Sequence, residues 1–253
     1  MMKIIAFIAV YNEEEIIKKC VENAKEQELD VLVLDNGCTD KTIEIVKSLG
    51  IPVFEYKTEK YNVFELNKQA ILQAKKIGCD WYVEKDADEM FETYDKKITI
   101  KEAVIKADRE GYNCMRFDMY EFWPTVIDDP TIEDFTNRIQ HYSYYDSRHL
   151  KMIKNSSEIH TNDSHRPKGV IKESPDRLIL RHYKFISIEQ GRKKIKNRLS
   201  RFYTHTSKGI NKQYNNFIDE DKSYVLEEST YQRLHKFDGT WIKKRVFDGW
   251  RGY

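Results

Sequence analysis

Hydrophobic and polar positions alternate in blocks along the first third of the chain. Short apolar runs have the length of buried strands, and the segments between them carry apolar residues at intervals of three and four. The runs therefore predict strands, and the intervening segments predict helices. The expected strands are residues 3–10, 30–35, 52–56 and 80–85, and the expected helices are residues 13–27, 41–49 and 63–77.

Residues typical of helix ends support these boundaries. Asn12 with Glu15 three positions later fits a capping box at the start of the first helix. Gly50 and Gly78 are placed to end the second and third helices. Regular alternation of strands and helices predicts a parallel sheet with right-handed crossovers. Ligands of such sheets bind beyond the carboxyl ends of the strands.

The rhythm changes after residue 90, where regular alternation stops. The remaining pattern predicts a helix at 100–109, strands at 113–122, 149–153 and 177–183, and a basic helix at 188–204. The segments 123–147 and 154–176 are polar or mixed, and we expect them to be irregular.

Composition limits the class of protein. Charged residues make up 34% of the chain and hydrophobic residues 40%, with 43 basic and 42 acidic side chains. This is a soluble globular composition, and the balance of charge argues against a nucleic-acid partner. No apolar run reaches the roughly 18 residues that span a bilayer, so we expect no transmembrane segment. The four cysteines show no CxxC spacing, which favours reduced thiols and a cytoplasmic location.

Polar clusters follow three of the expected strands. They are residues 11–13, 35–37 and 86–88. Because parallel strands end at the same edge of a sheet, the three clusters are expected to converge there. Asp86 and Asp88 could together hold Mg²⁺ or Mn²⁺, with phosphate oxygens completing the shell. The alternatives are a solvated acidic turn and a phosphatase nucleophile, and the second is disfavoured because four strands come before it.

The second cluster suggests a different role. Asp35 ends a strand, where its carboxylate could accept hydrogen bonds from a base or a ribose hydroxyl. Gly37 would let the backbone turn sharply beside a ligand. A simple strand-to-helix turn is the alternative.

Four segments together resemble the successive motifs of family-2 glycosyltransferases. They are "VYNEE" at 10–14, "LDNGCTDKT" at 34–42, "ELNKQAILQAK" at 65–75 and "EKDADEMF" at 84–91. Their order, spacing and strand–helix context match. Two later segments, "RFDMYEFWPT" and "LRHYKFISIEQGRKK", are similar to a bacterial subgroup of the family.

The resemblance implies an α/β fold of GT-A type, with a Rossmann-like, mostly parallel sheet flanked by helices. It implies a nucleotide-diphosphate sugar donor of UDP, GDP or dTDP type, an Mn²⁺ or Mg²⁺ cofactor, and a saccharide or glycolipid acceptor. Residues 1–110 would form the nucleotide-sugar-binding half and residues 111–205 the acceptor-binding, sheet-completing half. Residues 206–253 would form a helical or irregular C-terminal extension.

Site residues follow from matching positions. The resemblance places Asp86 and Asp88 at the metal, with His182 as a third protein ligand. The expected donor-binding residues are Val10, Tyr11, Glu13, Asp35, Asn36, Asn67, Asp86, Ala87 and Lys184. Two positions depart from the family pattern, because Asn36 stands where many members have a second Asp and Cys38 replaces the usual Ser.

An inverting transfer also needs a base for the acceptor hydroxyl. The candidates are Asp134, Glu133, Asp163 and His165. The pair at 133–134 looks most like the Glu-Asp pair of the family, and the sequence leaves the choice open.

The leading hypothesis is a metal-dependent glycosyltransferase that works by inverting single displacement. A sugar nucleotidyltransferase is the first alternative, disfavoured because the loop "VYNEEE" is acidic and lacks glycine. A catalytically inactive nucleotide-sugar-binding protein is the second. The pattern leaves the oligomeric state open, as well as peripheral contact with the inner face of the membrane.

Overall fold

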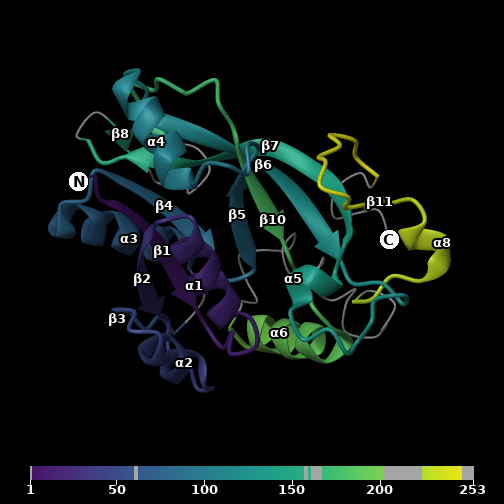
Figure 1. Cartoon of the computed structure of the whole chain (residues 1–253). Coiled ribbons are helices and arrows are strands. Elements are labelled where there is room, and N and C mark those ends of the chain that lie inside the picture. Colours follow the sequence, from purple (N-terminus) through teal and green to yellow (C-terminus); the bar gives the residue numbers. More distant parts are fainter. Residues whose placement is uncertain (1, 60–61, 157–158, 161–166, 202–223, 247–253) are drawn as a thin grey trace. The chain divides into compact units, whose positions relative to one another are not determined.

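A computed structural model describes residues 2–59, 62–156, 159–160, 167–201 and 224–246 of the chain (Figure 1). The chain forms two compact units. The first comprises Met1–Thr58, Asn62–Met119 and Asp146–Leu180, and the second comprises Glu59–Tyr61, Tyr120–Tyr145 and Arg181–Tyr253. The three-part division expected from the sequence stays a prediction.

The first unit contains most of the regular structure. Its elements are β1 (Ile4–Val10), α1 (Ile17–Glu26), β2 (Asp30–Asp35), α2 (Thr42–Ser48), β3 (Val53–Glu55), α3 (Val63–Ile77), β4 (Trp81–Asp86), β5 (Glu89–Thr93), α4 (Ile100–Arg109), β8 (Ile159–His160) and β9 (Lys168–Gly169). Three strands contribute residues to both units: β6 (Cys114–Trp123), β7 (His141–Lys154) and β10 (Leu178–His182). The second unit adds α5 (Phe135–Arg138), α6 (Ile188–Arg201), α8 (Glu228–Tyr231) and β11 (His235–Lys236).

The main sheet has the strand order β3-β2-β1-β4-β7-β6-β10-β5. Its first four strands are parallel, and β7 joins β4 antiparallel. The chain builds outward from β1 through β2 to β3, and then crosses back to place β4 on the other side of β1. The gap between β1 and β4 is therefore a topological switch point, where open α/β sheets bind ligands.

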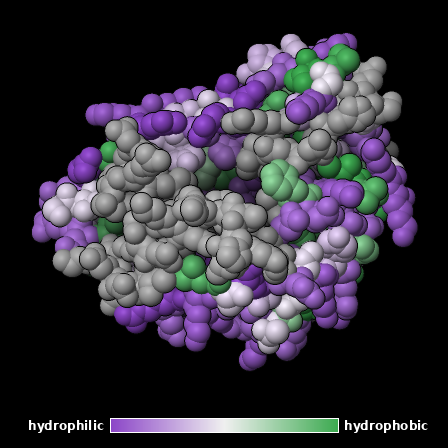
Figure 2. Space-filling view, turned by 180° about the vertical axis from the view of Figure 1, so that it is seen from behind, coloured by the Kyte–Doolittle hydropathy of each residue, from purple (hydrophilic) through white to green (hydrophobic). Residues whose placement is uncertain are grey.

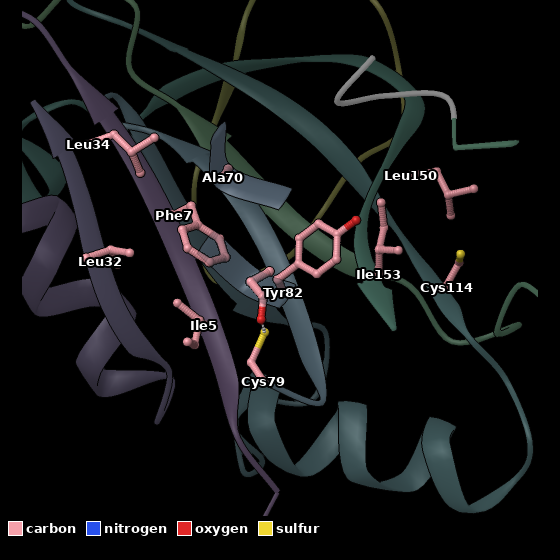
Figure 3. Close-up of a cluster of buried hydrophobic side chains, with 11 residues drawn as sticks. Ile5, Phe7, Leu32, Leu34, Ala70, Cys79, Tyr82, Cys114, Leu150 and Ile153 are labelled. Carbon is pink, nitrogen blue, oxygen red and sulfur yellow. Dashed lines mark hydrogen bonds between the residues drawn. The ribbon is translucent and has the colours of Figure 1, made fainter. Parts of the chain in front are cut away.

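The core of the first unit lies between α3 and the parallel strands (Figure 3). Ile5 and Phe7 of β1 pack there with Tyr82 of β4, whose ring meets that of Phe7 edge-on at 6.3 Å between centroids. Ala70 and Ala74 present the apolar stripe of α3 to these strands. Because side chains alternate along a strand, the neighbouring positions of β1 are buried on the opposite face of the sheet.

The predicted capping box at the start of the first helix is wrong. Asn12 has a left-handed backbone with φ of 56°, and α1 begins only at Ile17. The Asn12 side chain instead accepts a hydrogen bond from the N–H of Thr39 at 2.7 Å. Asn tolerates this backbone region better than most residues. The polar residues before α1 thus form a loop that bonds to the next loop of the sheet.

The expectation of an irregular segment at 123–147 is also wrong. Residues 123–147 contain α5 and the start of β7, which runs continuously from His141 to Lys154. Short-range alternation failed to mark this strand because its aromatic residues lie on both faces. The pattern also showed no sign of β5, whose Met90 and Phe91 are buried at 4% and 0% exposure.

The second unit is built around aromatic rings. Phe122 stacks against Tyr142 and Tyr183, with centroid distances of 5.4 and 4.9 Å. The Tyr142 hydroxyl donates to the carbonyl of Thr240 and accepts from the N–H of Ile242, which ties the segment after β11 to β7. Ring packing and two hydroxyl bonds therefore hold this part of the chain in place.

On the face in Figure 2, most of the coloured residues are hydrophilic, and apolar residues appear in small separate groups. Scattered exposed apolar residues of this kind are normal on globular proteins. No helix among the described residues is long and apolar enough to cross a membrane.

Candidate functional site

The strand registers bring three predicted site positions to one edge of the first unit. Val10 of β1 pairs with Asp35 of β2, and Ala9 pairs with Asp86 of β4. Neighbouring strands lie 4.7–4.9 Å apart, so Asp35 and Asp86 flank the end of β1 at roughly 10 Å from each other. The expected convergence of the strand ends is thus present, on both sides of the switch point.

Asp35 builds the turn at the end of β2. Asp35 is 6% exposed, and its Oδ1 accepts the N–H groups of Gly37 and Cys38 at 2.9 and 2.8 Å. Gly37 has φ of 90°, a conformation that disfavours residues with a side chain. These bonds hold the carboxylate in one orientation at the sheet edge.

Asn36 connects this turn to the segment after β3. It is 2% exposed, and its Oδ1 accepts both the N–H and the hydroxyl of Thr58, at 3.1 and 2.9 Å. The side chain of Lys57 lies over Gly37, within ordinary contact of where a Cβ would be. The structure therefore gives Asn36 a role in shaping the loop, one that its amide oxygen fulfils without a negative charge.

The β1–α1 loop is bonded to the β2–α2 loop at several points. The N–H of Glu13 donates to the Thr42 hydroxyl at 2.8 Å, and Cys38 Sγ lies 3.4 Å from the N–H of Asn12 and 3.6 Å from the carbonyl of Val10. Burial raises the pKa of the Cys38 thiol to about 12, so it stays protonated. Cys38 thus bridges the loops, as a serine hydroxyl could.

The turn after β4 is not a solvated acidic turn. Asp86 is exposed, but Asp88 and Glu89 are each only 3% exposed. Glu89 Oε2 accepts the N–H of Asp86 at 3.0 Å, so the carboxylate closes the turn on itself. Of the three acids in this segment, Glu89 therefore secures the turn.

Two buried lysines support this turn. Lys151 of β7 donates to both oxygens of Glu89, at 2.6 and 2.8 Å, and the Lys85 ammonium donates to the Glu89 carbonyl. Burial acts to lower the pKa of Lys151, but attraction to Glu89 and Asp86 outweighs it and raises the pKa above its ordinary value. Lys151 is therefore charged, and its charge is matched by Glu89.

The first helix also contacts the turn. Cys20 Sγ lies 3.5 Å from the carbonyl of Asp86, and Asn23 bonds both the N–H and the carbonyl of Phe91 in β5, at 2.7 and 3.0 Å. These bonds hold α1 against β5 next to the turn. None of these supporting residues was found from the sequence. The sequence held one sign of this support. Lys85 lies on the same face of β4 as the buried Trp81 and Val83.

The Asp86–Ala87–Asp88 turn fits a hard divalent cation. It offers carboxylate oxygens two residues apart, one exposed and one buried, and Mg²⁺ is commonly bound by one or two carboxylates plus phosphates. No three His, Cys, Asp or Glu side chains of the described residues are grouped to hold a metal by themselves. A cation bound at this turn would need water and phosphate oxygens to complete its shell.

The other predicted donor-site residues lie in both units. In the first, Tyr11, Glu13 and Asn67 are half-buried. In the second, Lys184 is 3% exposed with its ammonium 5.0 Å from the Phe185 ring, and His182 Nδ1 lies 3.4 Å from Glu121 Oε1.

Of the four predicted base residues, the structure describes Asp134 and Glu133, which belong to the second unit. Asp134 caps α5, with Oδ1 accepting the N–H and the hydroxyl of Thr136 at 2.9 and 2.6 Å. Glu133 is exposed. Asp163 and His165 lie outside the described residues. Any of the four as the base stays a prediction.

Comparison with known proteins decides the family. The family model described as glycosyl transferase family 2 matches residues 5–162. This chain belongs to that family. The resemblance seen in the four motifs is thus confirmed, and so is the expected α/β fold of GT-A type, parallel over β3-β2-β1-β4 and antiparallel where β7 joins.

Individual relatives are more distant. The glycosyltransferase SunS of Bacillus subtilis, derived from the SPbeta prophage, is 26% identical over 175 residues, which are 68% of this chain and 36% of SunS. The chain thus spans about a third of the length of that relative. An uncharacterized glycosyltransferase of Rickettsia typhi is 33% identical over 89 residues, 35% of this chain and 29% of its own.

A solved structure is also similar in part. Glucosyl-3-phosphoglycerate synthase from Mycobacterium tuberculosis, crystallised with Mn²⁺, uridine diphosphate and phosphoglyceric acid, matches with a TM-score of 0.36 and 15% identity. The match covers 47% of this chain and 43% of the synthase.

Proposed function

We propose that this family-2 member is a metal-dependent glycosyltransferase. It transfers a sugar from a nucleoside-diphosphate donor to a saccharide or lipid-linked acceptor by inverting single displacement. One observation carries the proposal: the registers that set Asp35 and Asp86 on either side of Val10 at the switch point. Donor binding there is the function this edge supports best.

The β2 side and the β4 side of this sheet edge suit different parts of the donor. Asp35, held by two backbone N–H groups, can accept hydrogen bonds from the base or ribose. Tyr11, Glu13 and Asn36 belong to the surrounding loops, and Asn67 lies on α3 of the same unit. Asp86 and Asp88, with Ala87 between them, would lie at the diphosphate, roughly 10 Å from Asp35 across β1.

The chemistry concerns the charge of the leaving diphosphate. Mn²⁺ or Mg²⁺, when bound by Asp86 and Asp88, would stabilise that charge as it develops. Lys184 is proposed to add a second positive charge. His182 is proposed as a further metal ligand, and the Glu121 carboxylate beside its Nδ1 is the kind of partner that orients ligating histidines.

The acceptor hydroxyl must lose a proton during the transfer. Glu133, Asp134, Asp163 and His165 remain the candidates for the base. The Asp134 carboxylate accepts three hydrogen bonds from Thr136 and Asn137. Of the two described candidates, Asp134 is therefore the less available to accept a proton. Replacing each residue in turn and measuring transfer at saturating donor would identify the base by the largest loss of kcat.

Thermal stabilisation tests donor binding directly. The melting temperature is measured with UDP, GDP, CMP and dTDP, each with Mn²⁺ and with EDTA. Ligands that bind the native state raise this temperature by mass action, and we expect one nucleoside diphosphate to do so only with Mn²⁺. If no nucleotide shifts the melting temperature, the proposed function is wrong.

A matched pair of variants tests the metal ligand. Asp88→Ala should abolish the part of the shift that needs Mn²⁺. Asp30→Ala, at the opposite, exposed end of β2, should keep the whole shift. An Asp88 variant that retains the metal-dependent shift would rule out this ligand role.

A further inference from the structure

The turn that carries the proposed metal ligands is supported by a charge pair buried beneath it. The side chains of Lys151 and Glu89 are 2% and 4% exposed, and their closest approach is 2.6 Å. Glu89 uses Oε2 for Lys151 and, at the same time, for the N–H of Asp86. A single carboxylate therefore links an ammonium in β7 to the backbone of Asp86.

The remaining contacts make Glu89 the centre of this support. The Lys85 ammonium donates to the Glu89 carbonyl and lies 4.5 Å from the centroid of the Phe91 ring. Cys20 Sγ contacts the carbonyls of both Asp86 and Glu89, at 3.5 and 3.9 Å. The two ends of the turn are thus fixed, whereas the Asp86 carboxylate is exposed.

Removing the Lys151 ammonium would leave the Glu89 carboxylate buried without its main counter-charge. A buried, unpaired carboxylate is costly, so the Glu89 side chain would rotate toward water. This rotation would break its bond to the Asp86 N–H. The turn would then no longer hold the carboxylates of Asp86 and Asp88 in one arrangement.

We propose that Lys151 is a positioning residue for the metal and diphosphate site, acting through Glu89 on Asp86 and Asp88. This inference rests on the proposed function. It gives a buried lysine, far from these aspartates in the sequence, a role in metal affinity as well as in stability. Residues that support metal ligands commonly change metal affinity by about tenfold or more when they are replaced.

The test compares two lysines of β7. Lys151→Met removes the ammonium beneath the turn, and Lys154→Met removes one that pairs with Asp108 of α4, at 2.7 Å. The probes are Mn²⁺ with UDP, GDP or dTDP, whichever stabilises the unchanged chain. The spin resonance of free Mn²⁺ gives the metal affinity of each variant with nucleotide present.

We expect Lys151→Met to weaken Mn²⁺ binding by about tenfold or more. Lys154→Met should leave the Mn²⁺ affinity unchanged. Lys151→Arg keeps a positive charge for Glu89 and should restore most of the Mn²⁺ affinity. Unchanged Mn²⁺ affinity in folded Lys151→Met would overturn the proposal.

A second measurement needs no ligand. Amide hydrogen exchange at Asp86 should be faster in Lys151→Met and unchanged in Lys154→Met, because only the first variant disturbs its acceptor. If the unchanged chain binds no nucleotide, the proposed function fails, and unaltered exchange at Asp86 would refute the positioning role separately. If Lys151→Met does not fold, Glu89→Gln replaces it, since its single carbonyl oxygen cannot serve both donors as the carboxylate does.

Discussion

The two units bury their polar groups in different ways. In the first unit, directional hydrogen bonds and charge pairs at the strand ends hold Asp35, Asn36 and Glu89. In the second, polar groups are enclosed by rings, as where the Arg181 guanidinium lies 4.6 Å from the Phe237 ring and 5.2 Å from the Trp241 ring. Hydrogen bonds fix atoms at set positions, whereas ring packing fixes volume and shape.

The two kinds of burial suit different roles in the molecule. A donor site needs its carboxylates held before the ligand arrives, and hydrogen bonds at strand ends achieve that. The second unit instead draws its stability from a few large side chains. The first unit should therefore be sensitive to the loss of a hydrogen-bond acceptor, and the second to the loss of a ring.

The largest effect is expected from Phe122→Ala in the second unit. Phe122 is 1% exposed and lies against Tyr142, Tyr183 and other rings, so truncation should cost about 3–5 kcal/mol in the free energy of unfolding. Urea unfolding measures the loss. Phe64→Ala is the matched control, since Phe64 is 61% exposed and should matter little. A loss below about 1 kcal/mol at Phe122 would mean that the rings are not what holds this unit together.

The next effect concerns Asp35 in the first unit. Asp35→Ala removes the acceptor of two backbone N–H groups and should cost about 1.5–3 kcal/mol in unfolding free energy. Asp35→Asn keeps one acceptor oxygen and should retain most of the stability, but it removes the charge. We expect it to weaken nucleotide binding in calorimetry. Equal stability of the Ala and Asn variants would show that the turn does not depend on these bonds.

Much of the first unit could be predicted from the sequence. Apolar runs and glycine positions gave β2 and α3 with their observed bounds and gave β1 within one residue, because buried parallel strands and amphipathic helices leave strong periodic patterns. The convergence of Asp35 and Asp86 followed from the topology alone. The start of α1 was misjudged because Asn12 bonds to a neighbouring loop and not to its own helix.

The supporting charges and the second unit could not be predicted in the same way. Lys151 looks like an ordinary surface lysine in the sequence. Lys85 shares a strand face with buried residues, but only the tertiary structure pairs either lysine with Glu89. Strand β7 was missed over its first half because Tyr142 and Tyr144 are large and apolar while Ser143 between them is also buried. Period-two alternation fails where both faces of a strand are covered.

A smaller effect is expected from Gly191→Ala in α6. A Cβ at this position would lie 2.2 Å from Cδ1 of the buried Tyr224 ring, so helix or ring must shift. Overpacking of this kind costs about 1–3 kcal/mol, which thermal unfolding would detect. Lys196→Ala, at an exposed position of the same helix, should be nearly neutral. An unchanged melting temperature for Gly191→Ala would show that the contact with Tyr224 is loose. The second unit would then not depend on tight ring packing.

The smallest effect is a loss of stability at alkaline pH that originates in the first unit, where all four cysteines lie. Burial raises the pKa of the Cys114 thiol from 9.0 to about 12, with the Glu173 carboxylate adding to the rise. Since the folded pKa lies above the unfolded one, this contribution is complete below pH 9 and is lost as pH rises toward 12. At pH 10 the loss from this thiol should be about 1 kcal/mol. Cys114→Ala should therefore flatten the decline of unfolding free energy between pH 8 and 10 relative to the unchanged chain, and parallel declines would show that ionisation of Cys114 is not coupled to folding.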